Sequence, residues 1–189
     1  VDDIANYLDG ALGGSTRLVV TFGPEGDSTG RRAYLMTGDA GSYDVSAPAS
    51  DLVSVNFDVQ ASGGYRPGRW LRPLSTAGTT GSNGTVTMTG STLLGGSTGG
   101  AFLHLHVTAF STSASSTAAD SATIKVQHST SGSTWADYAT FTAVTAVTFQ
   151  RSTASATLKE KVRSTMSSKT AGAGITYAVA FARTLSPKS

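Results

Sequence analysis

Three histidines are the side chains of this chain that are best suited to binding a metal ion. His104 and His106 are separated by one residue, so on a strand both point to the same face, and His128 ends a second strand-like segment. Three imidazoles would suit zinc. The alternative is that both histidines of the HLH segment form the solvent-facing side of a strand whose apolar residues pack inward. We favour this alternative, because the sequence identifies no partners that would orient the imidazoles, and we expect neither a metal nor a cofactor.

Residues 95–99 form the pattern Gly-Gly-Ser-Thr-Gly, which matches the G-x-S-x-G motif of a serine nucleophile. That chemistry requires a strand before the serine and a helix after it, so that the hydroxyl is exposed on a strained turn. A strand-like segment, 101–110, follows instead, and such matches are expected by chance in a chain rich in Gly, Ser and Thr. Carboxylates are few, and no spacing sets two of them across a cleft as a glycosidase requires. We therefore expect no enzymatic activity.

The segment HSTSGSTWADY, residues 128–138, places two aromatic side chains after a Ser-Gly turn. Trp135 and Tyr138 could stack on sugar rings, as exposed aromatic residues do in carbohydrate-binding sandwiches. The alternative is that Trp135 fills the core, because large aromatic side chains usually bury most of their area. Core packing is the interpretation that we favour for Trp135, and glycan stacking by this pair stays an alternative.

The composition favours a structural protein that tolerates contact with copies of itself. The 189 residues include 22 glycines and no cysteine, and only 14% are charged, against about 25% in an ordinary soluble domain. The net charge is +2. We interpret the scattered arginines, among them Arg66, Arg69 and Arg72, as solvated loop charges, and expect no specific nucleic-acid binding. A weakly charged surface does not resist self-association. No apolar segment is long enough to span a membrane, so no membrane partner is expected.

The period of the apolar residues changes along the chain and predicts its elements. Residues 1–14 read as a helix, because apolar residues recur there at spacings of three and four. A period of two then predicts strands. These are expected at 17–22, 31–38, 41–47, 52–61, 85–89, 101–110, 121–129, 134–142, 146–151, 155–166 and 174–183. The Gly/Pro-rich stretch 68–84 is expected to link a β domain at 1–67 to a β-sandwich at 85–189.

The strings TFGPEGDSTG and GSYDVSAPASDLVSVNFDVQASGG resemble the major tail tube proteins of siphophages, the long-tailed bacteriophages. Residues 1–67 match the order of that family: a helix, a strand, a Gly-Pro-Glu-Gly turn, a strand pair and a Gly-rich exit. The family usually has a further β-rich segment before the helix, so we expect either that this sequence omits part of the tube fold or that the fold is completed differently. The string IKVQHSTSGSTWADYATFTAVTA is similar to an added sandwich domain on some virion proteins of actinobacterial phages.

The resemblance implies a mainly β fold: a tail-tube-type β-sandwich or barrel with one flanking helix, followed by a second β-sandwich domain. It implies a virion structural protein of the phage tail, assembled in the cytoplasm of the bacterial host. Such subunits form stacked hexameric rings, and DNA passes through the lumen without specific binding. The implied partners are further copies of the chain, the tape-measure protein and the tail terminator protein. The alternatives are a capsid decoration protein, another virion β-sandwich protein, or a carbohydrate-binding module.

Within this resemblance, two sets of residues are expected to contact the lumen or a neighbouring ring. Polar residues on the alternating strand pair are expected to face the lumen, where a neutral or acidic lining lets DNA slide because phosphate contacts dominate DNA affinity. These residues are Asp44, Asn56, Asp58 and Gln60. The long turn after the first strand is the expected ring-to-ring contact, and its candidate residues are Pro24, Glu25, Gly26 and Gly30.

Overall fold

The computed structural model describes residues 17–46, 54–62, 65–82, 85–87, 100–112, 120–170 and 173–183. This part of the chain contains strands but no helix, and therefore no helix that could cross a membrane. The strands are β1 (Leu18–Phe22), β2 (Arg32–Ser46), β3 (Ser54–Ala61), β4 (Arg66–Ala77), β5 (Gly81–Ser82), β6 (Val86–Thr87), β7 (Ala101–Ser111), β8 (Ala122–Ser129), β9 (Ala136–Thr140), β10 (Thr148–Ala154), β11 (Lys161–Lys169) and β12 (Gly174–Arg183). The expectation of a mainly β fold is confirmed. The helix expected at 1–14 and the serine pattern at 95–99 lie outside the described residues.

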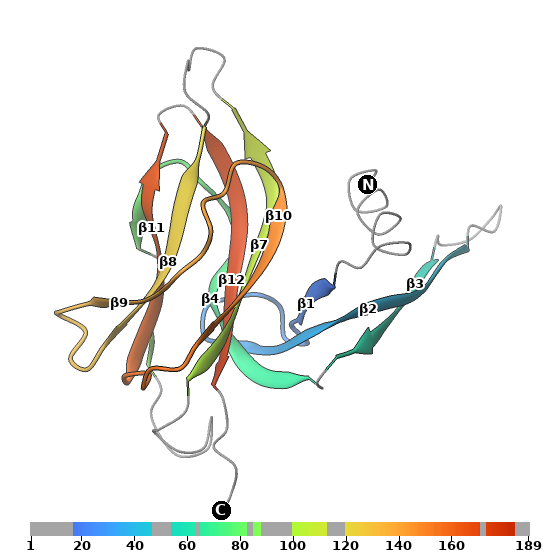
Figure 1. Cartoon of the computed structure of the whole chain (residues 1–189), viewed down its shortest axis with the longest axis horizontal. Coiled ribbons are helices and arrows are strands. Elements are labelled where there is room, and N and C mark those ends of the chain that lie inside the picture. Colours follow the sequence, from blue (N-terminus) through green and yellow to red (C-terminus); the bar gives the residue numbers. More distant parts are fainter. Residues whose placement is uncertain are drawn as a thin grey trace, which may run out of the picture. The chain divides into compact units, whose positions relative to one another are not determined.

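Hydrogen bonding joins these strands into two sheets (Figure 1). The larger sheet has seven strands, in the order β1-β2-β4-β12-β7-β10, with β3 paired to β2. The smaller sheet has five strands, in the order β5-β11-β8-β9, with β6 also paired to β11. The strands expected at 31–38 and 41–47 are one continuous strand, β2. Gly38 does not break it, because a Cβ at Gly38 would lie 2.3 Å from the carbonyl oxygen of Gln60, so glycine here permits close approach of two strands.

The chain forms two compact units, residues 1–20 with 36–65, and residues 21–35 with 66–189. In the first unit, β2 and β3 form an antiparallel hairpin whose register runs from Gly38 opposite Ala61 to Ser46 opposite Ser54. The register shifts between Ala40 and Ser42, and a bulge of this kind increases the local twist. Among the strands that the structure describes, β2 is the only one that pairs with β3.

The second unit is a β-sandwich in which the two sheets share one core. Buried residues of the larger sheet, such as Leu105 on β7 and Phe181 on β12, belong to the same apolar cluster as Ile124 on β8 and Val162 on β11. In Figure 1, β8 and β11 run alongside β7 and β12. Because side chains alternate along a strand, every second residue of these strands enters the core. Two sheets that share one core are therefore present, and they include β4 and β5, which precede the sandwich expected at 85–189.

Most of the linker expected at 68–84 is instead strand β4, which lies between β2 and β12. Its Trp70 and Leu71 are buried. The glycines of this segment are typical of a linker, but Gly68 has a different role. A Cβ at Gly68 would lie 2.1 Å from the carbonyl oxygen of Phe181, so glycine at this position permits close contact between β4 and β12. Pro73 is tolerated because the register between β4 and β12 shifts beside it, and prolines in sheets occur at such bulges.

The other face of the larger sheet carries a second, smaller apolar cluster. Ala178, Ala180 and Ala182 of β12 point away from the main core and pack with Leu35 and Trp70. Both faces of β12 are therefore covered, which explains why its sequence is nearly all apolar rather than alternating. Residues 21–35 belong to this unit, and Leu35 of this segment contributes to the second cluster.

Candidate functional site

His104 and His106 lie on the face of β7 that is opposite the main core, and both contact the hydroxyl of Thr21. Thr21 Oγ1 is 3.1 Å from Nδ1 of His104 and 2.7 Å from Nε2 of His106. His104 is only 2% exposed, so the expectation of solvent-facing histidines is wrong. Strand alternation predicted their common face correctly. The partner that buries them could not be predicted, because Thr21 is 83 residues away in the sequence.

The protonation of His106 follows from this burial. Desolvation lowers the pKa of His106 to about 4, so its imidazole is neutral at pH 7. A threonine hydroxyl has one proton and two acceptor lone pairs, so the tautomers of the two imidazoles decide which of these contacts Thr21 donates and which it accepts. His128 lies on β8 in the other sheet, where its ring centroid is 5.0 Å from that of Tyr138. Within the described residues, no three metal-ligating side chains come together.

The turn expected to contact a neighbouring ring is attached to β4 by hydrogen bonds. Gly26 and Gly30 have φ angles of 85° and 83°, a left-handed conformation that glycine adopts readily. The amide of Gly30 donates to the carbonyl of Trp70 at 2.8 Å, and Arg69 Nη1 donates to the carbonyl of Gly30 at 2.7 Å. Pro24, Glu25 and Gly26 are exposed at the tip of this turn. Contact with a second ring stays a prediction.

The residues expected to face a lumen lie on the β2–β3 hairpin. Asp44 is directly opposite Asn56 in the register, and Asp58 is directly opposite Ser42. Asp58 and Gln60 are two residues apart on β3, so they share a face, and both are exposed. The four residues therefore lie close to one another along the paired strands β2 and β3. The assignment to a lumen stays a prediction.

Trp135 and Tyr138, the candidate glycan-stacking pair, each contact other parts of the sandwich. Tyr138 packs against the sandwich core, and its hydroxyl donates to the carbonyl of Ala156 at 3.0 Å. Trp135 is half-buried, and the guanidinium of Arg163 lies 4.1 Å from its ring centroid. One face of the Trp135 ring is therefore covered by a cation, and glycan stacking by the pair stays a prediction.

A polar network extends from Arg163 across the exposed face of the smaller sheet. Arg163 Nη2 donates to Gln127 Oε1 at 2.8 Å, and Gln127 Nε2 donates to Asp137 Oδ1 at 2.8 Å. Lys125 Nζ lies 2.6 Å from the other oxygen of Asp137. The hydrogen bonds from Lys125 and Gln127 lower the pKa of Asp137. The network keeps the Arg163 guanidinium over Trp135. No local sequence pattern predicts it, because its members come from three strands.

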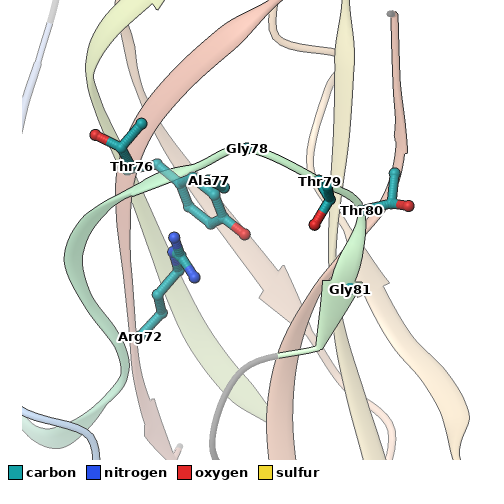
Figure 2. Close-up of a pocket in the computed structure, with 8 residues that line it drawn as sticks. Arg72, Thr76, Ala77, Gly78, Thr79, Thr80 and Gly81 are labelled. Carbon is teal, nitrogen blue, oxygen red and sulfur yellow. The ribbon is translucent and has the colours of Figure 1, made fainter.

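A pocket of about 250 Å³ lies at the connection between β4 and β5, at one end of the sandwich (Figure 2). Its lining is mostly polar and includes Arg72, Thr76, Thr79, Thr80 and Tyr177. Arg72 is only 5% exposed, so the interpretation of this arginine as a solvated loop charge is wrong. The Gly/Pro-rich pattern of 68–84 predicts a loop at Arg72. As part of β4, its side chain instead enters the space between the sheets.

A second pocket, of about 260 Å³, lies in the same unit and is mostly apolar. Trp70, Leu74, His106 and Phe149 contribute to its wall. The rings of His106 and Phe149 meet edge to face, with centroids 5.6 Å apart. The low pKa of His106 suits this surface, because a neutral imidazole is less costly to bury than a charged one.

Comparisons with protein-family models, curated proteins and solved structures find no match to this chain. Its function is therefore inferred from its residues and its fold.

Proposed function

We propose that this chain is a structural subunit of a phage tail tube, and that it assembles with further copies of itself through the β2–β3 hairpin. The strongest support for this proposal is the pairing of β3. Among the described strands, β3 pairs with β2 alone. The other edge of β3 then presents N–H and C=O groups that can pair with a strand of another chain. A two-stranded hairpin is marginally stable in water by itself. Pairing with a neighbouring subunit would stabilise it.

Strand pairing between identical subunits can generate a ring. When each subunit uses one edge to contact the next, the head-to-tail interface is heterologous, and a rotation that closes produces a ring. The resemblance of residues 1–67 to tail tube proteins supports six subunits and stacked rings, with tape-measure and tail terminator proteins as further partners. The weakly charged composition, 14% charged residues, supports close packing of many copies.

The exposed polar residues of β3 support a lumen that does not retain DNA. Asp58 and Gln60 share one exposed face, and neither is cationic. Because phosphate contacts from Lys and Arg dominate DNA affinity, a surface without them lets the duplex pass without specific binding. The β-sandwich of the second unit would be an accessory domain of the same subunit.

Electron microscopy of the purified chain at high concentration tests this proposal. We expect rings or tubes, and we expect Val59→Lys on β3 to reduce them strongly, because a charge on an edge strand opposes pairing. Val147→Lys is the matched control, since Val147 is 46% exposed in the sandwich unit and its replacement should leave assembly unchanged. A wild-type chain that stays monomeric at all concentrations, in microscopy and light scattering, would contradict the proposal.

A further inference from the structure

The connection between β4 and β5 takes the chain from one sheet of the sandwich to the other. β4 ends at Ala77, and β5 begins at Gly81, which pairs with Met166 of β11 in the smaller sheet. Thr165 Oγ1 also donates to the carbonyl of Gly81, at 3.1 Å. The connection therefore closes over the end of the sandwich, and the pocket of about 250 Å³ lies against it. At about 30 Å³ for each water in the liquid, this volume holds about eight waters or one small molecule.

Arg72 supplies positive charge to this pocket. Its guanidinium carbon lies 4.2 Å from the ring centroid of Tyr177, and its Nη2 donates to the carbonyl of Ser75 at 3.1 Å. These two contacts hold the plane of the guanidinium in one orientation. Figure 2 shows the side chain projecting from β4 toward the stretch that follows Ala77. A guanidinium that is held in place loses less entropy on binding, and its fork of N–H groups matches a planar oxyanion.

The hydroxyl groups of the connection differ in the direction in which they point. Figure 2 shows the Thr79 hydroxyl directed toward the side on which Arg72 lies, whereas the hydroxyls of Thr76 and Thr80 point away from it. Thr76 Oγ1 is also 2.8 Å from Thr176 Oγ1. Among the described residues that line the pocket, Arg72 carries the one formal charge. The lining therefore favours an anion, and the Thr79 hydroxyl is a further donor on the side on which Arg72 lies.

We propose that this pocket binds a compact oxyanion, the carboxylate or phosphate group of a small molecule, with Arg72 as the principal donor and Thr79 as the second. Binding at this site is independent of the assembly proposed above, because all of its residues belong to the sandwich unit. Because the ligand would contact Arg72 of the larger sheet and the connection to the smaller sheet, it would link the two sheets.

Titration of the full chain with sodium phosphate, and separately with sodium acetate, tests this site. Calorimetry and the amide shifts of the connection residues are the readouts, with sodium chloride at matched ionic strength as the control. We expect saturable binding of at least one of the two anions, with a dissociation constant of about 1 mM, as a few charge-assisted hydrogen bonds give. The anion that binds more tightly identifies the source as a phosphate or a carboxylate. No saturable binding of either anion beyond the chloride control would overturn the proposal.

Three variants assign the binding to this pocket. Arg72→Gln should weaken binding by about tenfold or more, because it removes a charge-assisted pair. Thr79→Val should weaken it about threefold or more, because it removes a hydroxyl that donates to the anion, and Thr80→Val, its matched control, should leave it unchanged. Thr79 and Thr80 are exposed, so both variants should fold even where Arg72→Gln does not. Equal effects of the two threonine changes would overturn the proposal.

Discussion

The hydroxyl of Thr21 lies 2.7 Å from Nε2 of His106, and the same oxygen is 3.1 Å from Nδ1 of His104. One threonine therefore attaches the segment before the Pro24 turn to two histidines of β7. Burial at this contact lowers the pKa of His106 to about 4, so its imidazole is neutral at pH 7. Because the pKa of His106 is lower in the folded protein, the free energy of unfolding should depend on pH.

Acidification should destabilise the protein between about pH 6.5 and pH 4. In that window the unfolded chain binds a proton at residue 106 and the folded chain does not, because the folded pKa is about 4 and the ordinary value is 6.5. The contribution of His106 to the free energy of unfolding is thus fully present above pH 6.5. It is lost as the pH falls toward 4, which lowers the free energy of unfolding by up to about 3 kcal/mol. Burial and Lys159 also lower the pKa of His128, which acts in the same direction. Urea unfolding at a series of pH values measures the effect.

The variant His106→Gln is the control for this pH dependence. Glutamine cannot titrate, so the slope of unfolding free energy against pH should decrease between pH 6.5 and pH 4, while the contribution of His128 remains. An unchanged slope in His106→Gln would show that His106 does not govern the pH dependence.

Two glycines near opposite ends of β4 should respond very differently to the same substitution. A Cβ at Gly68 would lie 2.1 Å from the carbonyl oxygen of Phe181, whereas a Cβ at Gly78 meets nothing within 4 Å. Gly68→Ala should therefore force β4 away from β12 and cost about 3 kcal/mol or more. Gly78→Ala should change stability by about 0.5 kcal/mol or less. Thermal unfolding of both variants checks the difference, and a small cost for Gly68→Ala would refute the close strand contact.

The stacking of Arg163 on Trp135 should show as a coupling energy in a double-mutant cycle. Removing Arg163 or Trp135 singly should lower the free energy of unfolding by more than the Arg163–Trp135 interaction energy, because each side chain also makes other hydrogen bonds. The coupling should be about 0.5–1 kcal/mol, the value for a cation over an aromatic ring at a partly exposed site. Urea unfolding of Arg163→Ala, Trp135→Leu and the double variant measures it. Additive effects would mean that the 4.1 Å contact contributes no stability of its own.

The alternation of apolar and polar residues was sufficient to predict most strands. The segments expected at 101–110, 121–129 and 174–183 are observed as β7, β8 and β12 with bounds that differ by at most one residue. Alternation is local, because it reflects which face of one strand is buried. It also predicted that His104 and His106 share a face. Neither the order of strands in a sheet nor their partners follows from it.

The misassigned segment shows where local pattern fails. The glycines and prolines of Arg66–Ala77 are typical of a linker, yet this segment forms β4, in which Gly68 permits close contact with β12 and Pro73 lies beside a bulge. These roles exist only once β12 is paired with β4. A residue type that favours a turn in isolation can thus be required inside a strand by a neighbour about a hundred residues later.

The sequence by itself determined the class of fold, the faces of the strands and the weakly charged surface, because these depend on residue types and short spacings. Only the tertiary structure decided that Arg72 enters a pocket, that Thr21 contacts His104 and His106, and that Tyr138 packs against the sandwich core. Each of these relationships joins residues of different strands. Their positions follow from strand pairing and sheet packing, which bring together groups that no local pattern relates.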